Sequence, residues 1–355
     1  MKARGLLLLC LFLTGCLFTI NQPLVGPDGT AAFFLDENGR YNVFSEGGTL
    51  HLLKGGELIA VPAATVPELG GVADWAPDGC ELLYISTRLE SFLQTSSSTL
   101  ARIAARSDAE PEVVLQSEAI IKDAAFTLDG RVAVLRFAEE PLGTLDLYDP
   151  TCDAFERVFD DVLAFRLDPS RTSVVALHVD LEGPVPIGRL ARWRLGEHDP
   201  EILADFVLGE QMLEIAYVLS DKILLDIDPT GQWVAISLFD QVFIDPQAEE
   251  EVPALYLVDT WNRRVERLAE IGFIPVFSPD GTHLAYITSD DGDLGYAIVR
   301  NLETESSVQV PASEGASTCF WLGDDELGLS FGSDDDTQRM SVINLGSGQH
   351  RSLVE

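Results

Sequence analysis

Carboxylates are the side chains in this sequence that are most able to do chemistry, because many of them occur in short clusters. Grouped carboxylates can coordinate a cation or attract a basic protein surface. A Ca²⁺ ion at the Asp290 cluster would need about six to eight oxygen ligands, some of them from the backbone. No EF-hand pattern occurs, so we expect no cofactor and keep Ca²⁺ only as an alternative. The clustered acids are Glu139, Glu140, Glu249, Glu250, Glu251, Asp290, Asp291, Asp293, Asp334, Asp335 and Asp336.

Catalytic motifs are not found among the other reactive side chains. No GxSxG nucleophile motif, HExxH metal motif or phosphate-binding loop occurs in the sequence. Glycosidases use a pair of carboxylates, and paired carboxylates are frequent in this sequence. Their number alone therefore does not exclude a glycosidase, and an enzyme is kept as the alternative. We therefore expect a protein that is not an enzyme. The histidines are dispersed and lack metal-ligand spacing; they are His51, His178, His198, His283 and His350.

The overall charge excludes two classes of partner. There are 23 Lys and Arg residues against 58 Asp and Glu residues, which gives a formal net charge of −35. Phosphate contacts need a basic surface, so nucleic acid is not expected as a partner. Direct electrostatic adhesion to anionic lipid is not expected for the same reason. Hydrophobic residues make up 46% of the chain, which is too many for a disordered acidic protein, so we expect a large folded core.

The beginning of the chain has the pattern of an export signal. Lys2 and Arg4 precede an apolar stretch, Gly5–Leu13, that is too short to span a bilayer in the usual way. The sequence Leu13-Thr14-Gly15-Cys16 that follows resembles a bacterial lipobox, in which the cysteine is lipidated after cleavage. The resemblance implies a lipoprotein signal peptide over residues 1–15 and attachment to a membrane only through lipid on Cys16. An ordinary secretory signal with a chance cysteine is the alternative.

Cleavage before Cys16 would remove Lys2 and Arg4 and change the formal charge from −35 to −37. Leu17 follows the cysteine, and a residue other than Asp at this position implies outer-membrane sorting in Gram-negative lipoproteins. We therefore expect an exported protein that is anchored to the cell envelope, at the outer membrane and on its periplasmic or surface side.

Three later cysteines can form at most one bridge and match no metal or redox spacing; they are Cys80, Cys152 and Cys319.

A repeated segment runs along the chain. Its two clearest copies, VFSPDGTHLAYI (276–287) and DWAPDGCELLYI (74–85), share an apolar residue, a Pro-Asp-Gly turn and a second apolar run. Proline presets φ, aspartate bonds the turn backbone and glycine accepts positive φ, so each copy predicts two strands joined by a tight turn. The aligned apolar residue recurs about every 49 positions, a spacing typical of propeller blades. These residues are Val25, Trp75, Phe126, Leu167, Ile227, Phe277 and Trp321.

The copy FSPDGTHLAYIT, followed by YAIVRNLE, resembles the repeat of TolB-like β-propellers, which are related in shape to WD-repeat propellers. The resemblance covers essentially the whole mature chain. It implies an all-β fold with a single β-propeller of seven four-stranded blades, with six or eight blades as alternatives. The last copy has its own outer strand, His350–Val354, so ring closure need not borrow a strand from the N-terminus. The expected blades are residues 17–62, 72–116, 121–160, 162–206, 222–269, 272–311 and 317–355.

Antiparallel alternation places the long loops of such repeats on one face of the ring. Seven of these loops together hold 19 acidic residues and only three basic ones, Arg40, Arg88 and Arg339. The clustered acids named above would therefore form an acidic rim that binds a protein partner with a basic surface. A role in keeping the protein soluble is the alternative.

Other polar and aromatic residues occupy repeat positions. The turn residues Asp28, Asp78, Asp129 and Asp280 are expected to cap turns rather than to bind a ligand. The aromatic residues of the aligned column, Trp75 among them, are expected to pack between blades. Inner strands would line a central channel, whose candidate ligand-binding residues are Lys122, Asp123, Arg166 and Asp226.

Together these features predict a lipid-anchored, non-enzymatic β-propeller. Its expected role is to bind a protein, or to act as a scaffold, in a complex of the bacterial cell envelope. The alternative is an envelope enzyme, or a propeller that binds a small ligand or glycan at the mouth of its channel.

Overall fold

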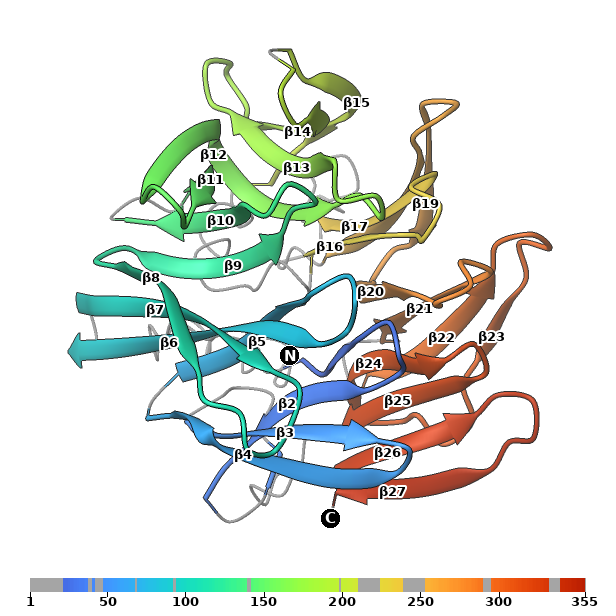
Figure 1. The fold of residues 1–355 in the computed structure, drawn as a ribbon. Coiled ribbons are helices and arrows are strands. Elements are labelled where there is room, and N and C mark those ends of the chain that lie inside the picture. Colours follow the sequence, from blue (N-terminus) through green and yellow to red (C-terminus); the bar gives the residue numbers. More distant parts are fainter. Residues whose placement is uncertain are drawn as a thin grey trace.

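The chain folds, in a computed structural model, into antiparallel sheets that surround a central axis (Figure 1). The structure describes residues 22–37, 40–41, 47–67, 69–91, 94–138, 142–197, 199–209, 224–238, 253–289, 295–331 and 339–354. Strands and turns dominate these residues, which confirms the predicted all-β fold class. In this described part of the chain, no helix is long and apolar enough to cross a membrane.

Five of the six described sheets have four strands each, in chain order from the axis outward. The first comprises β1 (Leu24–Val25), β2 (Ala31–Leu35), β3 (Gly48–Lys54) and β4 (Glu57–Val66). The second comprises β5 (Leu69–Trp75), β6 (Glu81–Ser91), β7 (Gln94–Ala104) and β8 (Glu112–Ser117). A third sheet comprises β16 (Leu225–Ile227), β17 (Trp233–Leu238), β18 (Ala254–Asp259) and β19 (Arg264–Ala269). A fourth comprises β20 (Phe273–Phe277), β21 (His283–Thr288), β22 (Tyr296–Asn301) and β23 (Ser307–Gln309). The last comprises β24 (Ala316–Gly323), β25 (Glu326–Phe331), β26 (Arg339–Asn344) and β27 (His350–Val354).

The remaining sheet has seven strands because β12 belongs to two repeat units. The first part of β12 pairs with β11, and its last part pairs with β13, with Val162 taking part in both ladders. Asp161, with a φ of 56°, lies at this junction. The count of seven blades and the blade boundaries therefore stay predictions. The strands are β9 (Ile120–Phe126), β10 (Val132–Phe137), β11 (Gly143–Asp149), β12 (Ala154–Leu167), β13 (Ser173–Asp180), β14 (Ile187–Arg194) and β15 (Glu201–Val207).

The repeat turns are held by their aspartates, as the sequence predicts. The Oδ1 of Asp28 accepts the backbone N–H of Thr30 at 3.0 Å, and the Oδ1 of Asp78 accepts that of Cys80 at 2.9 Å. Asp129 and Asp280 make the same bond to the residue two positions later. Gly29, with a φ of 78°, occupies the left-handed region that the turn requires. The capping role of these four aspartates is confirmed.

The aromatic residues of the aligned column pack between neighbouring sheets. Trp75, Phe277 and Trp321 are all buried. The indole N–H of Trp75 donates to the carbonyl of Leu24 at 2.9 Å, and that of Trp321 donates to the carbonyl of Val276 at the same distance. In both cases the acceptor lies on the inner strand of the preceding sheet. Each tryptophan therefore joins two sheets by apolar burial and by one directional bond.

Among the described strands, none is shared between the first and the last sheet where the ring closes. Every described sheet contains strands that are consecutive in the sequence, as expected from the outer strand at His350–Val354. Across this junction, the side-chain Nε2 of Gln22 donates to the carbonyl of Cys319 in β24 at 3.2 Å. Side-chain packing and such single bonds therefore close the ring.

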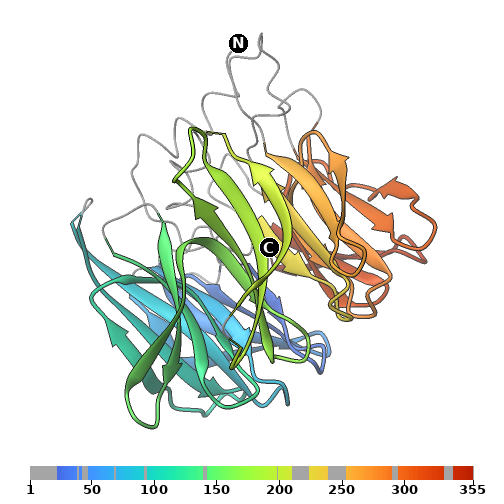
Figure 2. The same cartoon turned by 90° about the horizontal axis from the view of Figure 1, so that it is seen from above.

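The strands run between two faces of the ring (Figure 2). One face, here called the turn face, carries the Pro-Asp-Gly turns and the turns between third and fourth strands. The opposite face, here called the loop face, carries the loops between second and third strands and the connections between sheets. Backbone bonds confirm that these two kinds of segment lie together: Gly272 donates to Pro253 at 2.8 Å, and Gly315 donates to Gly295 at 2.7 Å.

Candidate functional site

The inner strands surround a cavity of about 780 Å³ on the axis of the ring, here called the central channel. Its walls include residues of β1, β5, β9, β12, β16, β20 and β24. Prolines of the repeat turns, such as Pro27 and Pro229, contribute to the lining. The charged lining residues are Asp74, Asp123, Arg166, Asp168, Arg171 and Asp226.

Three of the four predicted channel residues line this cavity. Arg166 donates from one guanidinium nitrogen to Oδ2 of Asp123 and to the carbonyl of Phe165, both at 2.8 Å. Asp123 itself is buried. The ammonium of Lys122, in contrast, lies 5.5 Å from the centre of the Phe137 ring, and Lys122 is not one of the described lining residues.

A β-bulge explains the position of Lys122. In the ladder between β9 and β10, Asp123 pairs with Leu135 and Ile121 pairs with Arg136, so the register shifts by one residue at Lys122. The extra residue breaks the simple alternation of side chains along β9. Asp123 then faces the channel, while Lys122 lies beside the aromatic ring of the neighbouring strand.

Asp226 is a channel group whose protonation is altered by its surroundings. Burial raises the pKa of its carboxyl to about 6, against the opposing effect of the Arg166 charge and of backbone N–H donors. One of those donors is the N–H of Phe277, which lies 2.8 Å from Oδ2. Asp226 can therefore hold a proton in slightly acidic solution, or attract a cation once it is ionised.

Arg171 and Asp74 form a second charged pair that sequence reasoning missed. The guanidinium of Arg171 makes an ion pair with both carboxylate oxygens of Asp74. It also donates to the carbonyls of Phe126 and Trp75, both at 2.8 Å. Arg171 has a φ of 56° and follows Asp168-Pro169-Ser170, at the position where five of the other six copies of the turn have glycine. This substitution of arginine for the turn glycine was the available signal.

Asp74 and Asp226 occupy the same position in their repeats, one residue before the aligned apolar residue. Each carboxylate accepts the backbone N–H of the aligned residue in the next repeat unit, Phe126 for Asp74 and Phe277 for Asp226. Arg171 donates to two further backbone carbonyls, so these charged groups link neighbouring inner strands by hydrogen bonds. Their bonds are therefore structural as well as available for chemistry.

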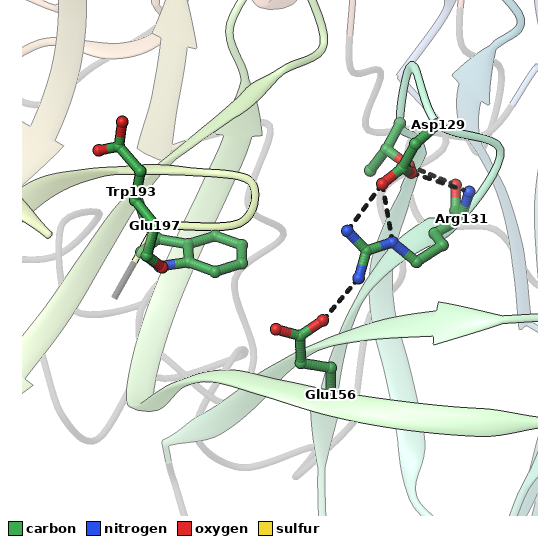
Figure 3. A network of polar contacts seen from close by, with 6 residues as sticks. Asp129, Arg131, Glu156, Trp193 and Glu197 are labelled. Carbon is green, nitrogen blue, oxygen red and sulfur yellow. Dashed lines mark hydrogen bonds and ion pairs between the residues drawn. The ribbon is translucent and has the colours of Figure 1, made fainter. Parts of the chain in front are cut away.

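A network on the turn face has a similar structural role (Figure 3). Arg131 lies between two carboxylates, with Asp129 at 2.7 Å and Glu156 at 2.6 Å. Hydrogen bonds from Arg131 lower the pKa of Asp129 to about 2. On the adjacent part of Figure 3, the indole N–H of Trp193 donates to the carbonyl of Glu197 at 2.8 Å. Both sets of bonds fix the geometry of turns.

The acidic rim and the lipidation site lie outside the described residues, so both stay predictions. The three later cysteines are described and are free, with Cys80 and Cys152 exposed and Cys319 buried. Among the described residues, no group of three or more His, Cys, Asp or Glu side chains could hold a metal ion. The central channel is therefore the predicted site whose geometry the described residues define.

Neither a family model nor a curated protein sequence matches the chain, but solved structures do. TolB from Acinetobacter baumannii matches with a TM-score of 0.51 and 15% identity, over 78% of this chain and 64% of TolB. The β-propeller domain of the Trilobed protease from Pyrococcus furiosus, described as having an open velcro topology, matches with a TM-score of 0.60 and 9% identity, over 96% of this chain and 99% of that domain. The chain is a β-propeller.

Enzymes are also found among structures that resemble this β-propeller. An oligogalacturonate lyase in complex with manganese matches with a TM-score of 0.56 and 10% identity, over 94% of this chain and 85% of the lyase. At such identities the similarity establishes the fold, and the fold alone does not define an activity.

Proposed function

We propose that this β-propeller is a lipid-anchored, non-enzymatic component of a bacterial cell-envelope complex, in which it binds a protein partner or acts as a scaffold. The lipobox-like sequence ending at Cys16 supports export and anchoring. The similarity to the fold of TolB is compatible with this role.

The non-enzymatic part of the proposal is supported by one observation: the charged side chains of the channel are bonded to the backbone of neighbouring inner strands. Asp74 and Asp226 each accept a backbone N–H from a neighbouring repeat unit, and Arg171 donates to two backbone carbonyls. Arg166 is occupied by Asp123 and by a carbonyl. A catalytic group must exchange protons or partners during turnover, whereas these groups hold inner strands together. Function is therefore assigned to the outer surface.

The acidic rim is the proposed partner site, and a basic protein surface is its proposed partner. Clustered carboxylates raise the local concentration of a positively charged partner, and this attraction weakens as salt screens the charges. Glutamine replacements at Glu249, Glu250 and Glu251 should therefore weaken association with the envelope partner that co-purifies from native membranes.

A matched control separates the rim from overall charge. Glutamine replacements at Glu57, Glu110 and Glu303 remove three exposed charges from the turn face. We expect the rim variant to recover several-fold less partner in low salt and the control variant to recover a normal amount. Equal recovery by both variants would make the rim a solubility feature.

Anchoring has its own test. Cys16→Ser should move the protein from the membrane fraction to the soluble fraction, and mass spectrometry of the wild type should show acyl chains on Cys16. A wild-type protein without acyl chains would contradict the anchor while leaving the partner-binding proposal open to the rim experiment.

Binding of a small ligand in the central channel is the second candidate function. The cavity of about 780 Å³ is large enough for such a ligand, and the altered pKa of Asp226 favours a cationic one above pH 6. A thermal-shift screen of cationic and sugar ligands should find compounds whose effect is lost in Asp226→Asn. If no compound stabilises the wild type, this candidate fails.

A further inference from the structure

Exposed apolar residues surround the mouth of the central channel on the turn face, and they are here called the apolar ring. Five of them are prolines of the repeat turns, which line the channel and are exposed. The sixth is Leu128, which takes the place of the proline in its own turn and is 65% exposed. The channel therefore opens on the turn face, because part of its wall is exposed there. The prolines are Pro27, Pro77, Pro169, Pro229 and Pro279.

Neighbouring turns of the apolar ring contact one another. A Cβ atom added at Gly281 would lie 3.2 Å from Cδ of Pro229 in the preceding turn. In another turn, the N–H of Leu128 donates to the carbonyl of Arg171 at 3.0 Å. Proline has a fixed φ, so these turns lose little conformational freedom when a partner covers them. The ring is therefore a preorganised apolar surface, and exposed apolar surface rimmed by polar residues is typical of interaction sites.

The channel beneath the apolar ring has an excess of negative charge. Its charged lining residues are aspartates and arginines, and each arginine forms an ion pair with one aspartate. The two remaining aspartates, Asp168 and Asp226, form no ion pair with any side chain that the structure describes. The channel therefore attracts a cation.

A second acceptor inside the channel lacks a donor. Gln22 is 6% exposed; its Nε2 donates to the carbonyl of Cys319, but its Oε1 has no hydrogen-bond partner among the described residues. Asp226 is near the same residue, because burial and the charge of Asp226 raise the pKa of the Cys319 thiol. Asp226 precedes Pro229 by three residues, so it lies roughly 10 Å below the ring. An ammonium or guanidinium group would supply both acceptors with donors and positive charge.

We propose that the apolar ring binds an apolar peptide segment of a partner protein, and that one lysine or arginine of this segment enters the channel toward Asp226 and Gln22. The apolar side chains of the segment would cover the prolines and Leu128, which a small cation would leave exposed. A second copy of this chain is disfavoured, because copies with a formal charge of −35 repel each other. The proposal rests on the channel as a binding site, which is the second candidate function, and it is independent of the acidic rim and of the lipid anchor.

Short synthetic peptides test this proposal on the full-length protein. The main probe has two leucines on each side of a central lysine, and its ends are acetylated and amidated so that the lysine carries its only charge. A second peptide has glutamate in place of the lysine, and a third has serines in place of the leucines. Isothermal titration calorimetry compares their binding to the wild type, Leu128→Ser and Val308→Ser. Val308, 64% exposed on the outer strand β23, is the matched control for Leu128.

We expect the main probe to bind the wild type and Val308→Ser equally well, and to bind Leu128→Ser about fivefold more weakly because apolar burial is lost. Pro77→Ser is a second ring variant and should weaken binding in the same direction. Asp226→Asn should weaken binding of the main probe about tenfold through loss of a charge-assisted hydrogen bond. The glutamate and serine peptides should bind the wild type about tenfold more weakly than the main probe.

Equal binding of the main probe by the wild type and both ring variants would overturn the proposal, as would equal binding of the leucine and serine peptides. A wild-type dimer that Leu128→Ser converts into a monomer in sedimentation would assign the ring to a second copy and would equally overturn it. If a small cation stabilises the wild type but not Asp226→Asn, and the main probe does not bind, the channel remains a ligand site and the peptide proposal alone fails.

Discussion

Replacing Asp226 by asparagine should stabilise the protein in neutral solution and not in acid. The asparagine side chain can still accept the N–H of Phe277, because its amide oxygen can take the place of Oδ2. What the replacement removes is the cost of keeping a negative charge in the wall of the channel. Arg166 retains its bond to Asp123 in the variant.

The size of the effect follows from the pKa of Asp226. A rise from 3.8 to about 6 means that ionising this carboxyl costs about 3 kcal/mol more in the folded protein than in the unfolded chain. Side-chain relaxation in the channel makes this figure an upper bound. For a chain of this length, about 3 kcal/mol corresponds to a rise in Tm of about 4 °C.

The direction of the Asp226 pKa shift determines the pH range over which the two proteins differ in stability. A group whose folded pKa is raised stabilises the folded state fully below its unfolded pKa, near 3.8, and loses that contribution as pH rises through about 6. The wild type should therefore match Asp226→Asn near pH 4 and become less stable than the variant between pH 4 and pH 7. The difference should then stay constant up to pH 8.

Denaturant unfolding of both proteins at a series of pH values measures this difference, because other titrating groups cancel in the comparison. Asp205→Asn, at an exposed position, serves as the control and should change stability by less than about 0.5 kcal/mol. A variant that is less stable than the wild type at pH 8, or a difference that does not change with pH, would refute the assigned cost of the buried charge.

Three other predictions concern bonds between sheets and thiol reactivity. Arg171→Met should destabilise the protein by about 3 to 5 kcal/mol in denaturant unfolding, because it leaves a partly buried carboxylate without its partner; a loss below about 1 kcal/mol would show that the pair is not structural. Trp75→Phe should cost about 1 to 2 kcal/mol through loss of its indole hydrogen bond and some apolar burial, whereas Trp261→Phe, at a 65% exposed position, should cost less than about 0.5 kcal/mol. Cys80 should react with iodoacetamide several-fold faster than Cys152, because a hydrogen bond to a neighbouring carboxylate raises the pKa of the Cys152 thiol; equal rates would contradict that bond.

The parts of the fold that were predictable from the sequence depend on local chemistry. A Pro-Asp-Gly turn needs only its own residues, so the turns, the capping aspartates and the flanking strands could be located by inspection. The burial of Trp75 and its equivalents followed from their repeat position, since each falls where two sheets meet.

The features that were missed depend on contacts between distant residues. The orientation of Lys122 could not be read from alternation, because a bulge in β9 shifts the register at this residue. The role of Arg171 depends on Asp74, which lies 97 residues earlier, so no local pattern could reveal the pair. The sequence spacing did not reveal that β12 is one continuous strand that pairs with both β11 and β13, because spacing does not show whether a connection is hydrogen-bonded.

The continuity of β12 has a consequence for how the ring opens. In an array of separate sheets, each unit can lose its hydrogen bonds while its neighbours remain folded, and amide hydrogen exchange then reports one protection level per unit. The ladders from β9 to β15 pass through one unbroken strand, so neither half of this sheet can detach without disrupting the other. This segment should exchange its amides as a single cooperative block of seven strands, against four in each of the other described sheets. Local opening should concentrate at the junction between the first and last sheets, on the far side of the ring.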